Sequence, residues 1–171
     1  LNEKHQHSIA ALTPPGYTLH HIDRHQRTGG GVAIVHRDSL RVVSSENKSY
    51  PSYDLIEKKF VTRSSAFIFS VIYRTNTNNP VSRFIDDFSS YLESLLTTKN
   101  KLVICGDFNI HMDKPTSSDT LRFNELLEST GLKQHVASPT SKMGHIIDLV
   151  LTRETESPSQ VLVKDDLISW F

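Results

Sequence analysis

The 171-residue sequence predicts one domain, spanning residues 1–171, with an α/β (α+β) sandwich fold. Short apolar runs typical of strands alternate with two segments of helical periodicity. Two of the runs suggest a hairpin, which argues against a purely doubly wound fold. Apolar residues make up 37% and charged residues 22% of the chain, close to the averages for globular proteins. A chain of this length is expected to bury a single core.

The first predicted strand follows a glycine run. Gly29 to Gly31 stand directly before the apolar run 32–35. A strand follows rather than a helix, and no Lys-Ser or Lys-Thr pair is present, so a nucleotide-binding loop is not favoured. The segments Tyr53 to Val61 and Ser65 to Tyr73 predict an antiparallel hairpin with a short polar connection. The second of these is so continuously apolar that we expect it to be buried on both faces.

Two amphipathic helices are expected next. The first begins at Asn79 and Pro80, and its apolar residues recur at spacings of three and four: Phe84, Ile85, Phe88, Leu92, Leu95 and Leu96. The second runs from Asp119 to Thr130, ends at Gly131 and carries Leu121, Leu126 and Leu127 on its apolar face. We predict strands at 101–106, 146–151 and 160–163, and surface loops at 76–79 and 152–159.

Charge and cysteine content set few limits on function. Nineteen basic and nineteen acidic residues cancel, so net charge neither indicates nor excludes a nucleic-acid partner. The single Cys105 lies in an apolar run and is interpreted as a buried structural thiol of a reducing compartment. No signal peptide or membrane-spanning stretch is apparent. The chain starts at Leu1 and stops at Phe171, which we interpret as cuts through a longer reading frame.

The strongest local signal for chemistry is the run Leu102 to Asn109, a buried strand that ends in Asp107 and Asn109. Alternate side chains of an extended backbone share a face, so the acid and the amide would project together. One can hold a cation or accept a proton while the other hydrogen-bonds a phosphate oxygen, as metal-assisted hydrolysis requires. An Asx turn after the strand is the structural alternative.

Two further strand ends carry candidate residues. Asp148 is the single carboxylate within the apolar run 146–151, and a carboxylate there needs a partner or a metal. Alternatively, it closes a hairpin after Gly144 or pairs with a nearby histidine. Tyr73 and Arg74 end the most apolar strand and could offer a phenol and a guanidinium to a phosphate. A purely structural role is the alternative for the tyrosine.

The order of these motifs resembles the endonuclease/exonuclease/phosphatase superfamily, and most of all the apurinic-type endonuclease of non-LTR (LINE-type) retrotransposons. The segments that carry the resemblance are TGGGVAIVHRDSL (28–40), VIYR (71–74), LVICGDFNIH (102–111) and HIIDLVL (145–151). It implies a DNase-I-like fold, with two mixed β-sheets packed between helices and incomplete in this chain. It also implies Mg²⁺ or Mn²⁺ as the cofactor, with no small-molecule cofactor.

The resemblance assigns roles to single residues. Asp107 matches the acid that activates or orients the attacking water, and Asn109 the residue that holds a phosphate oxygen; both are assigned to an incomplete metal site. Tyr73 matches a phosphate-contacting phenol, and Asp148 an acid that orients an essential histidine. Thr140 matches the hydroxyl residue before that strand, and Arg74 is assigned with it to substrate binding.

Departures from the family pattern lower the activity that we expect. No Glu-Thr-Trp motif with its metal-binding Glu occurs, and Trp170 and Phe171 stand where a terminal Asp and His belong. A lost hydrogen-bond donor to the transition state costs about 10² to 10³ in rate, so we expect little or no nicking. A non-catalytic nucleic-acid-binding remnant and a phosphomonoesterase of the same superfamily are the alternatives.

The implied partners are double-stranded DNA and, in the parent protein, a reverse transcriptase domain, with no membrane contact and a nuclear location. Five arginines are candidates for phosphate contacts: Arg24, Arg27, Arg37, Arg41 and Arg74. The pairs His5 with His7 and His20 with His21 lack a third zinc ligand at a recognised spacing. His111 could replace the missing base, although a loop histidine is usually only solvated.

Overall fold

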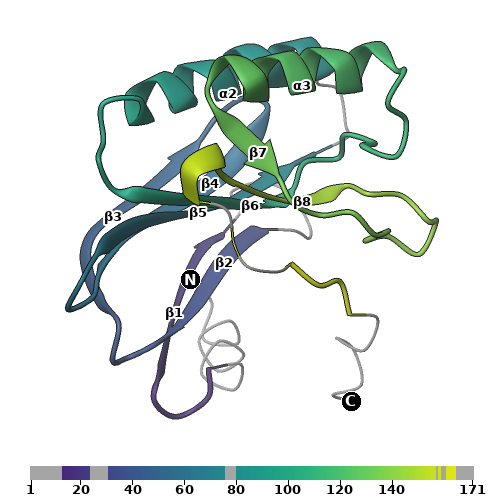
Figure 1. The fold of residues 1–171 in the computed structure, drawn as a ribbon. Coiled ribbons are helices and arrows are strands. Elements are labelled where there is room, and N and C mark those ends of the chain that lie inside the picture. Colours follow the sequence, from purple (N-terminus) through teal and green to yellow (C-terminus); the bar gives the residue numbers. More distant parts are fainter. Residues whose placement is uncertain (1–12, 24–30, 76–79, 157, 159–160, 165–171) are drawn as a thin grey trace.

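The computed structural model describes residues 13–23, 31–75, 80–156, 158 and 161–164. In these residues the chain forms two sheets, two α-helices and one short 3-10 turn (Figure 1). The large sheet has six strands in the order β3-β4-β5-β6-β8-β7, and β1 and β2 form a separate two-stranded sheet. The predicted sandwich of two sheets with helices is confirmed. Among the described residues, both helices cover the same face of the large sheet, and β1 with β2 lies on the other face (Figure 1).

Most predicted elements are present with boundaries shifted by one or two residues. The strands are β1 (Tyr17–Asp23), β2 (Gly31–Arg37), β3 (Arg41–Ser49), β4 (Tyr53–Val61), β5 (Ala66–Arg74), β6 (Lys101–Asp107), β7 (Leu132–Gln134) and β8 (Asp148–Arg153). The helices are α2 (Val81–Leu95) and α3 (Ser118–Ser129), followed by the short 3-10 turn η1 (Glu154–Glu156). The strands β1, β3 and β7 were not predicted, because their sequences are polar or very short.

The predicted hairpin is β4 with β5, which pair antiparallel along their whole length. From β5 the chain crosses through α2 to β6, which lies parallel to β5. A parallel pair requires such a long crossover, and the helix supplies it. The strand β8 then pairs antiparallel with β6 on its other side. As a result β5, β6 and β8, the three strands that carry the candidate residues, are neighbours.

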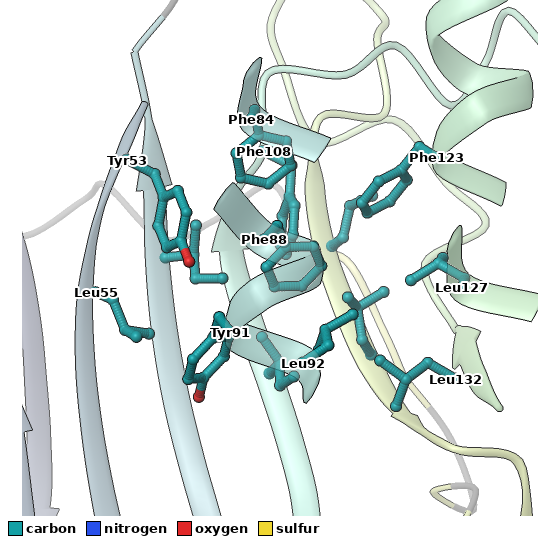
Figure 2. Packing of buried hydrophobic residues seen from close by; sticks show 14 of the residues in the cluster. Tyr53, Leu55, Phe84, Phe88, Tyr91, Leu92, Phe108, Phe123, Leu127 and Leu132 are labelled. Atoms are coloured by element: carbon teal, nitrogen blue, oxygen red, sulfur yellow. The ribbon is translucent and has the colours of Figure 1, made fainter. Parts of the chain in front are cut away.

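An aromatic core lies between the helices and the large sheet. Figure 2 shows the rings of Phe84 and Phe88 from α2 close to those of Phe108 and Phe123. All four side chains are fully buried. A smaller apolar cluster fills the space under the two-stranded sheet and consists of Val32, Ile34, Ile56 and Phe60. These clusters fix the large sheet between the helices and the β1–β2 pair.

Several sequence predictions about burial need correction. Leu121 is 49% exposed and Leu96 is 61% exposed; the buried residues of α3 are Thr120, Phe123 and Leu127. Helix α3 spans only 12 residues, so the positions of its leucines alone did not distinguish its buried face. The strand β5 is fully buried only toward the helices, and its other face is half-buried, because the β1–β2 pair covers the large sheet incompletely.

The predictions for the C-terminal part are also partly wrong. Residues 161–163 form no strand, and residues 152 and 153 extend β8 instead of forming a loop. The predicted features at Asn79, 76–79 and Gln160 lie outside the described residues.

The thiol of Cys105 is mostly enclosed, and burial raises its pKa to about 11, which suits the inert structural role that we predicted. No helix in the described part of the chain is long and apolar enough to cross a membrane.

Candidate active site

Four polar side chains form one row across the large sheet. Asp54 of β4 pairs with Tyr73 of β5, Tyr73 pairs with Asp107 of β6, and Asp107 pairs with Asp148 of β8. Residues directly opposite each other on paired strands share a face, with Cβ atoms about 4.5–5.5 Å apart. The row therefore places three carboxylates and a phenol on the same face of the sheet, away from the helices. Three of these four residues were predicted from the sequence.

Asp54 is the member of the row that the sequence analysis missed. Its side chain is 8% exposed, which is low for a carboxylate. The predicted hairpin already included Asp54, and the register of its two strands decides which residue lies opposite Tyr73. A connection of three residues, 62–64, would pair Tyr53 with Tyr73, whereas the observed turn at 62–65 pairs Asp54 with Tyr73. A shift of one residue in register moves a side chain to the other face of the sheet.

Several neighbouring groups shift the pKa of Asp107, the acid at the end of β6 in this row. Burial raises its pKa, and the negative charge of Asp148 acts in the same direction. Hydrogen bonds from Asn109 and the positive charge of Arg74 oppose the shift. One of the two carboxylate oxygens accepts the Asn109 backbone N–H at 2.9 Å. A cation between Asp107 and Asp148 would relieve the repulsion, since a nearby positive charge favours the ionised carboxylate.

Asn109 lies beside Asp107 in a backbone conformation that few residues adopt. Its φ is +50°, in the left-handed region that asparagine tolerates better than most side chains. The side-chain amide donates a hydrogen bond to the Arg74 backbone carbonyl. Together with the contact to Asp107, this is the Asx-type turn weighed above as the structural alternative. The turn holds Asn109 at the end of the row, so the structural and functional interpretations are compatible.

Arg74 lies on the opposite side of the sheet from Tyr73. It is 3% exposed, and its guanidinium is 5.7 Å from the centre of the Phe84 ring. It donates hydrogen bonds to the backbone carbonyls of Phe108 and Asn109, at 3.4 and 3.1 Å. Burial lowers its pKa, and nearby carboxylates act in the opposite direction. This position differs from the phosphate contact that the sequence suggested, and it makes Arg74 a support for the loop after β6.

The side chain of Thr140 holds the segment that leads into β8 through hydrogen bonds to its backbone, and we call this set of bonds the Thr140 clamp. Its hydroxyl accepts the backbone N–H groups of Ile147 and Asp148, at 3.1 and 3.0 Å. It donates a weaker hydrogen bond to the His145 carbonyl at 3.4 Å. The hydroxyl is thereby committed to the backbone. Thr140 fixes the start of β8, and with it the position of Asp148.

Replacing Thr140 with valine tests this clamp. We expect a loss of about 1–3 kcal/mol in the free energy of unfolding, because two backbone N–H groups lose their acceptor while the side-chain shape stays similar. Chemical denaturation monitored by circular dichroism measures it. Thr116→Val is the matched control, since Thr116 is exposed in a loop. Equal stability of both variants would contradict the clamp.

The remaining candidates are not brought to this row. Arg37 and Arg41 lie on the exposed parts of β2 and β3, while Arg24, Arg27, His5 and His7 lie outside the described residues. The ring of His20 stacks on His36, and their Nε2 atoms are 3.1 Å apart.

Among the described residues, no imidazole is hydrogen-bonded to Asp148. Pairing with a nearby histidine, the structural alternative for Asp148, is therefore not found in the described part of the chain.

Comparison with known protein families identifies the class to which the chain belongs. The model of the Endonuclease/Exonuclease/phosphatase family matches residues 1–169. The chain belongs to the endonuclease/exonuclease/phosphatase family. This confirms the broader part of the resemblance stated above. No curated protein sequence matches the chain significantly.

Solved structures of this family share the fold at low sequence identity. The catalytic domain of human Nocturnin is 18% identical, with a TM-score of 0.63 over 89% of this chain and 65% of its own. The endonuclease domain of TRAS1, a telomere-specific non-LTR retrotransposon, is 16% identical, with a TM-score of 0.63 over 82% and 66%. The mannosyl-6-phosphatase Bt3783 of Bacteroides thetaiotaomicron is 16% identical, with a TM-score of 0.62 over 94% and 72%.

These similarities show the fold alone, because the identities are low. The chain spans about two thirds of the length of these structures. One neighbour is an endonuclease and another a phosphatase, so the fold is compatible with both substrate classes. Members of the endonuclease/exonuclease/phosphatase family generally use divalent metals. The facing pair Asp107 and Asp148 fits such an ion, because carboxylate oxygens are the preferred ligands of Mg²⁺ and Mn²⁺.

Proposed function

We propose that this chain is a domain of a divalent-metal-dependent phosphodiester hydrolase that nicks double-stranded DNA, of the kind carried by non-LTR retrotransposons. The observation that carries the proposal is the row of Asp54, Tyr73, Asp107 and Asp148 across four adjacent strands, with Asn109 at its end. A reverse transcriptase domain in the parent protein is part of the same proposal. The likeness to the TRAS1 endonuclease domain supports it.

The chemistry follows from the position of each side chain. Asp107 orients a water molecule and accepts its proton. Tyr73 lies beside it and donates a hydrogen bond to a phosphate oxygen, and Asn109 holds another. Asp107 and Asp148, which lie opposite each other on adjacent strands, would hold the divalent ion, which supplies positive charge to the phosphate oxygens when bound.

The 171-residue chain by itself is expected to nick slowly. No imidazole accompanies Asp148 in the described part of the chain, so a hydrogen-bond donor to the transition state is absent there. Such a loss costs about 10² to 10³ in rate. The proposed activity is therefore weak and requires a sensitive assay at high protein concentration.

Conversion of supercoiled plasmid to nicked circles tests the proposal. With Mg²⁺ or Mn²⁺ we expect slow nicking, which stops when a chelator is added and falls to background in Asp107→Asn. Asparagine keeps the size of the side chain and its acceptor oxygen but removes the charge that holds the metal and takes the proton. The matched control is Asp86→Asn, an exposed acid on α2, which should nick at the rate of the unaltered chain.

Two outcomes would overturn the proposal. Equal background nicking in the unaltered chain and in Asp107→Asn would leave the chain as a non-catalytic remnant. Metal-dependent hydrolysis of small phosphomonoesters without plasmid nicking would instead favour the phosphatase class, which the likeness to Bt3783 makes the second candidate.

A further inference from the structure

A second cluster of ligand-type side chains lies outside the carboxylate row. His111 and Asp113 belong to the loop after β6, and His145 belongs to the loop before β8. One potential ligand atom from each of the three lies within 4.8 Å of the other two. Neither Asp113 nor His145 had been singled out as a candidate from the sequence, because the two loops are far apart in the chain. We name these three residues the loop cluster.

The carboxylate of Asp113 is the centre of the loop cluster. Its Oδ2 is 2.9 Å from Nδ1 of His145, and its Oδ1 is 4.0 Å from Nδ1 of His111. The same Oδ1 accepts the backbone N–H of Ile146 at 3.1 Å. The anion is thus oriented from two sides.

The two imidazoles meet edge to face, and one ring nitrogen of His111 has no hydrogen-bond partner among the described residues. Their ring centroids are 4.2 Å apart and the ring planes are inclined by 68°. Nδ1 of His111 is buried and makes no hydrogen bond within the described part of the chain. A buried polar atom without a partner is unfavourable, and one explanation is an ion that the atom binds. This nitrogen lies on the Asp113 side of the ring.

We propose that His111, Asp113 and His145 bind a borderline transition-metal ion of the Zn²⁺ class, with water in the fourth position. Two imidazoles and one carboxylate are a typical zinc ligand set that leaves one position open, and they differ from the all-oxygen donors that Mg²⁺ prefers. Ligand atoms around tetrahedral zinc lie about 3.2–3.6 Å apart, given bonds of about 2.0–2.2 Å. Small side-chain rotations therefore close the site.

The loop cluster has a consequence for the neighbouring active site. The backbone of Phe108 donates to the Ile147 carbonyl at 2.9 Å, and that of Met112 donates to the Ile146 carbonyl at 3.0 Å. The bound ion would add a further link between the same two loops, which carry Asn109 and lead into Asp148. It would therefore hold the active-site loops together without joining the carboxylate row.

Zinc binding by the whole chain tests the inference and does not depend on nuclease activity. Protein stripped of metal by a chelator is titrated with Zn²⁺ against a chromophoric zinc indicator. We expect one tight site that excess Mg²⁺ does not displace. The variants Asp113→Asn and His145→Gln should each bind about 100-fold more weakly or worse, since even the loss of an outer-shell partner costs about 10- to 100-fold. Co²⁺ should give the visible spectrum of a tetrahedral site in the unaltered chain only.

The matched control is His36→Gln, which removes one member of the other imidazole pair and should leave the tight site unchanged. Circular dichroism confirms that each variant is folded, and the two independent ligand variants protect the test against a single misfolded one. Tight binding that survives both cluster variants, or that disappears in His36→Gln, would overturn the inference. So would the absence of a tight site in the unaltered chain.

Discussion

Replacing Gly106 with alanine is expected to lower the free energy of unfolding by about 4 kcal/mol or more. A Cβ at this position would lie 1.9 Å from the carbonyl oxygen of Ile72 on the paired strand β5, and φ is +136°. Overpacking costs about 1–3 kcal/mol and a strained backbone about 1–3 kcal/mol, and both act here. Relief requires that β5 and β6 separate, which also separates Tyr73 from Asp107.

Urea denaturation followed by circular dichroism measures this effect. Gly131→Ala is the matched control, because Gly131 also has a positive φ, +66°, but nothing lies within 4 Å of the added methyl. It should cost only about 1–2 kcal/mol, the conformational part of the effect. If Gly106→Ala loses no more stability than Gly131→Ala, then the close approach of the two strands is not what requires the glycine.

Replacing Phe88 with alanine is expected to cost about 3–5 kcal/mol. The side chain is fully buried, and its ring lies against five others at centroid distances of 5.3 to 6.2 Å, those of Tyr53, Phe84, Tyr91, Phe108 and Phe123. The lost contacts and the cavity that remains both destabilise the chain, because rings from several elements cannot collapse into the space together.

Thermal and urea denaturation check this value against Leu121→Ala. Leu121 was assigned to the apolar face of the second helix from its spacing, but it is 49% exposed. Its replacement should change the free energy of unfolding by no more than about 0.5 kcal/mol. Comparable losses in the two variants would mean that α3 packs with a different face from the one described here.

The local pattern of apolar and polar residues in the sequence was sufficient to predict much of the fold. The continuous apolar runs of β5 and β6, and the spacing of Phe84 and Phe88 on α2, depend on neighbours in sequence, and those elements are confirmed. The polar strands β1 and β3 were missed because their pairing partners, not their own composition, make them strands. Leu121 was misassigned because periodicity in a short helix does not distinguish the face that the rest of the chain covers.

The sequence alone determined that acids and a phenol lie at or near the ends of buried strands, because strand propensity and side-chain alternation are local properties. Only the tertiary structure decided that Asp54 joins Tyr73, Asp107 and Asp148 in one row, since register depends on a turn one residue longer than predicted and on a parallel crossover. It also decided that His111, Asp113 and His145 meet. Contacts between segments distant in sequence arise from sheet pairing, and no local pattern encodes the partner.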